Sequence, residues 1–108
     1  MRIDIRSKRP ILRNNVGGMS GPAVFPIAVR MVWQVSNAVS IPVIGMGGVD
    51  SGAAAMEMML AGASAVQVGA AIFTDPYAPV RIVEELQALL EEQHIADVKE
   101  LIGAVKPW

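Results

Sequence analysis

The sequence contains no cysteine, one histidine and few aromatic residues, which make up 5% of its 108 residues. Without cysteine, the chain can hold no disulfide framework, no thiolate metal site and no cysteine nucleophile. Charged residues account for only 18% of the chain, below the usual quarter, and the net charge is −1. This balance gives no indication of a nucleic-acid partner or of binding to an anionic membrane surface.

Long hydrophobic runs are also missing. Gly, Pro and charged residues interrupt the apolar stretches, so none is expected to span a bilayer. The opening "MRIDIRSKRP" has no apolar segment of the kind found in secretory signals, and we expect a cytoplasmic protein with no membrane partner. Hydrophobic residues nevertheless make up 53% of the chain. Its elements are therefore expected to be covered on most sides, as in a piece of a larger buried architecture.

The spacing of apolar residues predicts an α/β chain that forms one partial domain over residues 1–108. Residues 1–21 are expected to form a short strand and a long loop, and residues 22–108 a helix-strand-helix-strand-helix series. The predicted helices are 22–39, 51–61 and 77–92, the strands are 2–5, 40–46 and 64–69, and short helices are expected at 70–75 and 96–103.

Strands that alternate with helices over short connections indicate βαβ units and a parallel sheet. The strand at 40–46 shows no polar alternation after Pro42, which is typical of a strand covered on both faces. Two main strands cannot form a stable sheet alone. The sequence therefore implies either more sheet from another chain or a truncated parent. Glycine loops after both strands and a short helix after the second fit the phosphate-binding end of a (β/α)8 barrel, so the expected fold class is a C-terminal fragment of such a barrel with its last strands and helices.

Glycines follow both main strands, in "IPVIGMGG" (41–48) and "AVQVGAAIF" (65–73). Because glycine has no Cβ, backbone N–H groups at Gly47, Gly48 and Gly69 could approach a phosphate closely, and the short helix that follows would add positive charge at its start. Tight turns that need a positive φ would explain the same glycines without any ligand. A dinucleotide-binding fold is less favoured, because "GMGGVDSG" does not match G-x-G-x-x-G.

Several other residues invite a functional role but have simpler explanations. His94 follows a Glu-rich helix and is expected to end it, since no metal-ligand partner lies at a useful spacing. Methionines at helical positions, including Met31 and Met58, are expected in the core. Gln67 is polar within a buried strand and should find a hydrogen-bond partner in the barrel or on a cofactor.

Three segments together carry a family resemblance: "NNVGGMSGPAVFPIAVRMVWQV", "IPVIGMGGVDS" and "AGASAVQVGAAIFTDPY". They resemble the C-terminal third of class 1 dihydroorotate dehydrogenases, and most closely the NAD-linked class 1B catalytic subunit. The resemblance implies an FMN-dependent (β/α) barrel that oxidises dihydroorotate to orotate in pyrimidine biosynthesis. It also implies a partner subunit that carries FAD and a [2Fe–2S] cluster. We also expect a homo-oligomer, because the sheet edges and apolar helix faces of the predicted fragment would be free.

The same resemblance places Gly21, Gly47, Gly48, Gly69 and Ala70 at FMN-binding positions. The family usually has threonine at the last of these, in "VGTANF", where this chain has "VGAAIF". The missing hydroxyl removes one phosphate hydrogen bond, but the backbone N–H of Ala70 remains.

The family's catalytic cysteine, flavin-side lysines and substrate asparagines belong to segments that this chain does not contain, so we assign it no catalytic residue and no metal ligand. Three hypotheses therefore remain: a part of a dihydroorotate dehydrogenase that holds the FMN phosphate, a catalytically silent fragment that self-associates, and a phosphate-binding part of another (β/α) barrel enzyme. Met1 matches an internal methionine of the family, so a fragment is expected.

Overall fold

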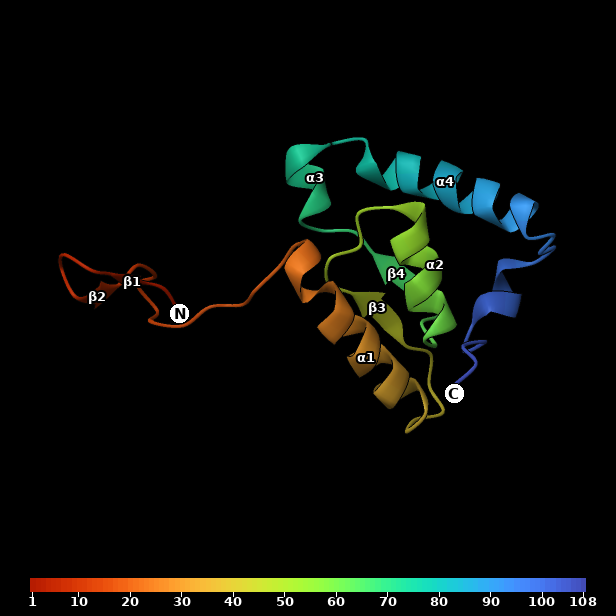
Figure 1. Ribbon diagram of the computed structural model, residues 1–108, viewed down its shortest axis with the longest axis horizontal. Helices are drawn as coiled ribbons and strands as arrows, with labels where there is room; N and C mark the ends of the chain where they lie inside the picture. The colour runs from red at the N-terminus through yellow and green to blue at the C-terminus, as the bar shows by residue number, and fades with distance from the viewer.

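An N-terminal hairpin stands apart from a body in which helices pack on two short parallel strands (Figure 1). The computed structural model describes residues 1–108. Its extents are 56 × 33 × 25 Å and its radius of gyration is 16.5 Å, against about 13 Å for a compact domain of this length. The molecule is therefore elongated, because the hairpin packs on no other element.

The hairpin pairs β1 (Ile3–Asp4) with β2 (Arg9–Pro10) in antiparallel register. The Asp4 carboxylate closes the turn, accepting hydrogen bonds from the Arg6 amide and the Ser7 hydroxyl, both at 2.9 Å. The predicted division of residues 1–21 into one strand and a loop is therefore wrong in part, since β2 lies within the predicted loop. Pro10 cannot donate to a ladder, but it is tolerated in a strand with a free edge.

The central sheet consists of β3 (Ile44–Met46) and β4 (Ala65–Gln67), which pair in parallel. Both strands lie within the predicted ranges 40–46 and 64–69 but are shorter. The remaining six elements are helical: η1 (Pro22–Val24), α1 (Phe25–Ser36), α2 (Gly52–Leu60), α3 (Ala71–Thr74), α4 (Ala78–Glu92) and η2 (Val98–Leu101). These match the predicted helices to within a few residues, although 22–39 begins as a 3-10 turn and 96–103 is a 3-10 helix only. None of the helices combines the length and hydrophobicity that crossing a bilayer requires.

The helices cover only one face of the sheet. Gly45 is buried and Val66 packs against the core, whereas the alternate residues Ile44 and Met46 are 52% and 56% exposed. Successive strand residues point to opposite faces, so these apolar side chains mark a second face that no element of the chain covers. The prediction that the strand at 40–46 is covered on both faces is therefore wrong for this chain by itself.

Helix α2 lies at the centre of the core, between the sheet and α4. The Ser51 hydroxyl caps it, accepting a hydrogen bond from the Ala54 amide at 3.2 Å. Met58 is fully buried and lies directly over Gly45, so that any Cβ at position 45 would collide with its side chain. Met31 of α1 was also expected in the core, but it is 53% exposed.

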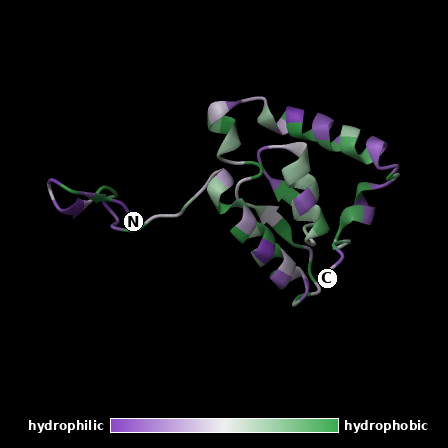
Figure 2. Ribbon diagram, viewed as in Figure 1, coloured by the Kyte–Doolittle hydropathy of each residue, from purple (hydrophilic) through white to green (hydrophobic).

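Helix α4 alternates hydrophobic and hydrophilic residues around its circumference, as Figure 2 shows. Ile82 is buried on its inner side and belongs to the main cluster with Met58. Leu86, Leu89 and Leu90 extend this apolar face toward the start of η2. Such a face stabilises a helix only when it is packed against other elements, and here it fixes α4 along α2.

Met58→Ala should lower the free energy of unfolding by about 2–5 kcal/mol, because it leaves a cavity between α2 and the sheet. Met31→Ala, its exposed counterpart, should change stability by no more than about 0.5 kcal/mol. Urea denaturation followed by circular dichroism measures both. Equal losses in the two variants would contradict the assignment of Met58 to the core.

Candidate functional site

Three segments that each carry glycine meet at the end of the sheet where β3 and β4 terminate. Gly21 precedes η1, Gly47 and Gly48 follow β3, and Gly69 and Ala70 follow β4. All five residues line one hollow of about 780 Å³, which continues along α1. The structure therefore brings together every residue that the sequence assigned to the cofactor site.

A second hollow of about 450 Å³ shares Gly21, Gly48, Gly69 and Ala70 with the first. Its wall also includes the Arg81 side chain from the first turns of α4. The glycines thus lie where the two hollows meet, with an apolar groove on one side and a polar wall on the other.

Gly47 and Gly48 adopt conformations that the fold itself requires. Their φ angles are +111° and +78°, which other residues rarely adopt. A Cβ on Gly48 would lie 2.8 Å from the carbonyl oxygen of Gly21 and 2.8 Å from the Cβ of Phe25. The backbones of the first two segments therefore touch, and glycine at position 48 is explained without a ligand.

Gly69 differs from these glycines in both respects. Its φ is not positive, and a Cβ built on it would meet no atom of the chain within 4 Å. Neither turn geometry nor packing against this chain explains a glycine here. The turn-only alternative accounts for Gly47 and Gly48 but leaves Gly69 without a reason.

The loops also present unused hydrogen-bond donors. The backbone amides of Gly47, Gly48, Gly69 and Ala70 donate to no acceptor of the chain. Helix α3 has only four residues, so single amides rather than a long helix dipole would carry the attraction for an anion. Several N–H groups around one hollow form the kind of site that can hold a phosphate.

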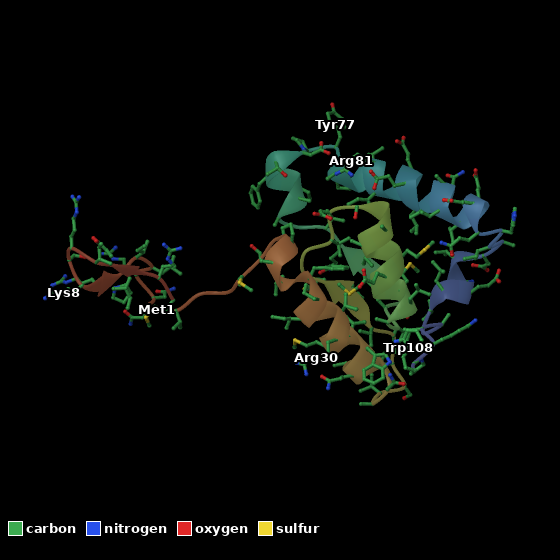
Figure 3. All side chains as sticks on the ribbon, viewed as in Figure 1. Met1, Lys8, Arg30, Tyr77, Arg81 and Trp108 are labelled. Atoms are coloured by element: carbon green, nitrogen blue, oxygen red, sulfur yellow. The ribbon has the colours of Figure 1, made fainter.

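The polar wall consists of Arg81, which Figure 3 labels on α4, and the three residues to which its side chain donates hydrogen bonds, Asp50, Asp75 and Glu85. The arginine Nε donates to Asp75 at 3.2 Å, its Nη1 to Glu85 at 2.7 Å, and its Nη2 to the carbonyl oxygen of Asp50 at 3.2 Å. The other oxygen of Glu85 accepts a hydrogen bond from the Gly52 amide at 2.7 Å. One arginine thus joins the loop after β3, the end of α3 and α4.

These contacts shift the ionisation of the charged partners. The Gly52 amide, followed by the Arg81 guanidinium, holds the pKa of the Glu85 carboxyl below its ordinary value. Hydrogen bonds to Glu85 and then to Asp75 raise the pKa of Arg81. Both Glu85 and Arg81 are therefore charged near neutral pH.

The sequence analysis did not identify Arg81 or Glu85 as parts of this wall. Their spacing of four residues was visible in the sequence and indicates an ion pair on one helix face. Their partners Asp50 and Gly52 lie about thirty residues away and contribute backbone atoms, which no sequence pattern marks. Asp75 is the C-cap of α3 as well as an ion-pair partner of Arg81.

Two further residues lie outside the network. Gln67 pairs with Met46 through the β3–β4 ladder, and its side chain is exposed without a hydrogen-bond partner in this chain, so the expected partner elsewhere in the barrel or on a cofactor stays a prediction. His94 follows α4 with a φ of +56°, which agrees with its predicted place at a helix end. No group of acidic or histidine side chains is arranged to hold a metal ion.

Comparison with known proteins decides the family. The family model described as dihydroorotate dehydrogenase matches residues 1–90. The chain belongs to the dihydroorotate dehydrogenase family. A relative from Geobacter metallireducens, named dihydroorotate dehydrogenase B (NAD(+)), catalytic subunit, is 61% identical over 106 residues. A relative of the same name from Geotalea uraniireducens is 59% identical over 105 residues. These names confirm the predicted resemblance to the NAD-linked class 1B subunit.

The chain spans about a third of the length of these relatives, covering 35% and 34% of them. Among solved structures, the dihydroorotate dehydrogenase of Eimeria tenella in complex with ferulenol matches with a TM-score of 0.78 and 27% identity. That match covers 94% of this chain and 28% of the other. The predicted fold class, part of a dihydroorotate dehydrogenase barrel, is therefore confirmed.

The lowered pKa of Glu85 predicts how the polar wall responds to acid. Because the folded pKa lies below the ordinary 4.5, the contact with Gly52 should persist at pH 4.5 and be lost only as the pH falls through the lower folded value. The NMR shift of the Gly52 amide proton, followed during acidification, reports this step. Glu85→Gln should abolish the transition, and a midpoint at or above 4.5 would contradict the assignment.

Proposed function

We propose that this chain forms the part of an FMN-dependent dihydroorotate dehydrogenase that holds the FMN phosphate. The phosphate would lie against the loops of Gly21, Gly48 and Gly69, with free amides from Gly47 and Ala70 also available. Bound FMN supplies the hydride acceptor for oxidation of dihydroorotate to orotate. The chain's own residues bind and orient the cofactor, and none of them is assigned to proton transfer.

The observation that carries this proposal is the unexplained glycine at position 69. Its conformation is open to other residues, and the chain leaves the space beside it empty. A ligand that approaches the backbone closely would require that space. The free amides around the same hollow supply the matching chemistry, since a phosphate dianion accepts several hydrogen bonds from N–H groups.

The names of the relatives also support a partner for the chain. They are catalytic subunits of an NAD(+)-linked enzyme, so we propose a separate electron-transfer subunit that carries FAD and a [2Fe–2S] cluster. Homo-oligomer formation and a cytoplasmic place in pyrimidine biosynthesis remain predictions. The family match disfavours the third hypothesis, a phosphate-binding part of an unrelated barrel enzyme.

Gly69→Ala tests the phosphate site directly, because the substitution should leave folding almost unchanged. Gly18 offers a matched control, since a Cβ there also meets no atom within 4 Å and its φ is not positive. Both variants belong in a chimaera in which this chain replaces the corresponding segment of the Geobacter metallireducens catalytic subunit. Gly69→Ala should weaken FMN binding roughly tenfold or more, about 1.4 kcal/mol per factor of ten.

Riboflavin, which lacks the phosphate, serves as the comparison ligand in the same fluorescence titrations. Its affinity should be similar in both variants. Equal FMN affinity for Gly69→Ala and Gly18→Ala would remove the basis of the proposal. Gly48→Ala is a poorer test, because the clash with Gly21 and Phe25 would disturb the loop with or without a phosphate.

The isolated 108-residue chain should show no orotate formation from dihydroorotate with added FMN and any electron acceptor. Dihydroorotate oxidation requires a base for one proton as well as a hydride acceptor, and the chain has no cysteine to serve as that base. The chimaera, assayed in parallel, provides the positive control. Sustained FMN-dependent turnover by the isolated chain would show that the assignment of no catalytic residue is wrong.

A further inference from the structure

We propose that Arg81 is a positioning residue that fixes the loop after β4 relative to the loop after β3. This inference rests on the proposed phosphate site and adds a residue that does not itself touch the phosphate. In this arrangement, Arg81 sets the spacing between the amides of Gly48 and Gly69.

The first two glycine segments need no such help. The carbonyl oxygen of Gly21 lies so close to Gly48 that no Cβ fits between them. Phe25, the first residue of α1, contacts the same position. Backbone packing alone therefore fixes these segments against each other. Small displacements would create clashes, because packed backbone atoms leave no free space.

The third segment lacks an equivalent contact. Nothing in the chain approaches the Cβ position of Gly69 within 4 Å. The β3–β4 ladder ends at Met46 and Gln67, before either glycine loop begins, and beyond it Val68 and Ala71 pack against the main core on one side. The position of Gly69 beyond that ladder depends on what restrains α3.

Arg81 provides that restraint on the other side. Its bond to Asp75 holds the end of α3, and its bond to the Asp50 carbonyl oxygen holds the loop after β3. Glu85 orients the guanidinium at 2.7 Å and also accepts a hydrogen bond from Gly52, at the start of α2. Both glycine loops are thereby attached to one side chain on α4.

The geometry favours positioning over direct attraction of an anion. Nε, Nη1 and Nη2 of Arg81 each donate to a partner in the chain. The carboxylates of Asp75 and Glu85 outweigh its single positive charge, so the cluster offers no net positive field to a phosphate. Its planar fork reaches three acceptors at fixed angles, which the single ammonium group of a lysine cannot reproduce.

The test uses Arg81→Met and Arg81→Lys in the chimaera described above, with Arg30→Met as the matched control. Arg30 lies exposed on α1 and makes no ion pair. Titrations with FMN and with riboflavin measure the effect on phosphate binding. Hydrogen exchange of the apo protein, read by mass spectrometry on peptides covering 49–55 and 69–77, measures loop restraint without any ligand.

Arg81→Met should weaken FMN binding roughly tenfold, because displacement of the loop after β4 would cost about one backbone amide hydrogen bond to the phosphate. Riboflavin binding should stay within about twofold. Exchange should become faster in both peptides. Arg81→Lys should recover only part of the FMN affinity, and Arg30→Met should match the parent chimaera in every measurement.

Unchanged exchange in the 69–77 peptide would overturn the inference, because the loop after β4 would then be fixed by something else. Equal loss of FMN and riboflavin affinity would also overturn it, since the damage would not be specific to the phosphate. Full recovery by Arg81→Lys would exclude the role of the planar fork. If exchange responds as expected but Gly69→Ala leaves FMN binding unchanged, the phosphate proposal fails while the attachment of the loops to Arg81 is supported.

Discussion

The missing side chain of Gly45 determines how closely α2 lies on the sheet. Met58 fills the space above it and is fully buried, and Ala63 borders the same contact. The close approach carries through to the start of α2, where a Cβ on Gly52 would lie 2.6 Å from the backbone nitrogen of Leu86. Helix α2 is thus held between the sheet and α4 by glycines at both of its contacts. The loop after β3 connects the sheet to α2, so the packing of these two elements fixes its position.

The candidate site is local in sequence although it belongs to a much larger fold. Its parts lie between Gly21 and Glu85, so one stretch of βαβ structure assembles the glycine loops and their polar wall. The second face of the sheet, with Ile44 and Met46 exposed, needs the rest of a barrel to cover it. The two requirements are separable: the glycine loops depend on close backbone packing within this segment, whereas the sheet depends on neighbouring strands.

Sequence reasoning succeeded where a single periodic pattern determines the structure. The spacing of apolar residues predicted helices at 51–61 and 77–92, and α2 and α4 match these ranges to within a residue. It failed where distant backbone atoms decide the outcome. The pairing of Arg9–Pro10 with β1 depends on a turn closed by Asp4, and composition alone made this segment a loop.

The same limit applies to the site. All five candidate cofactor residues could be proposed from the sequence by resemblance, and they lie around one hollow. The sequence could not separate Gly48 from Gly69, because φ and the space beside a missing Cβ are properties of the folded chain. Nor could it identify Arg81, whose acceptors include a backbone carbonyl 31 positions away.

The contrast between the two glycines also bears on how such a segment would change over generations. Glycine at position 48 is required by the contact with Gly21 and Phe25, so selection for folding alone would retain it. Position 69 is free of every such requirement within the chain. The proposed phosphate site is then the one constraint left at this position, and in a descendant without such a site alanine or serine could replace Gly69 without cost to the fold. Among descendants that kept the fold, the proposal therefore links a substitution at residue 69, but not at residue 48, to the absence of the ligand.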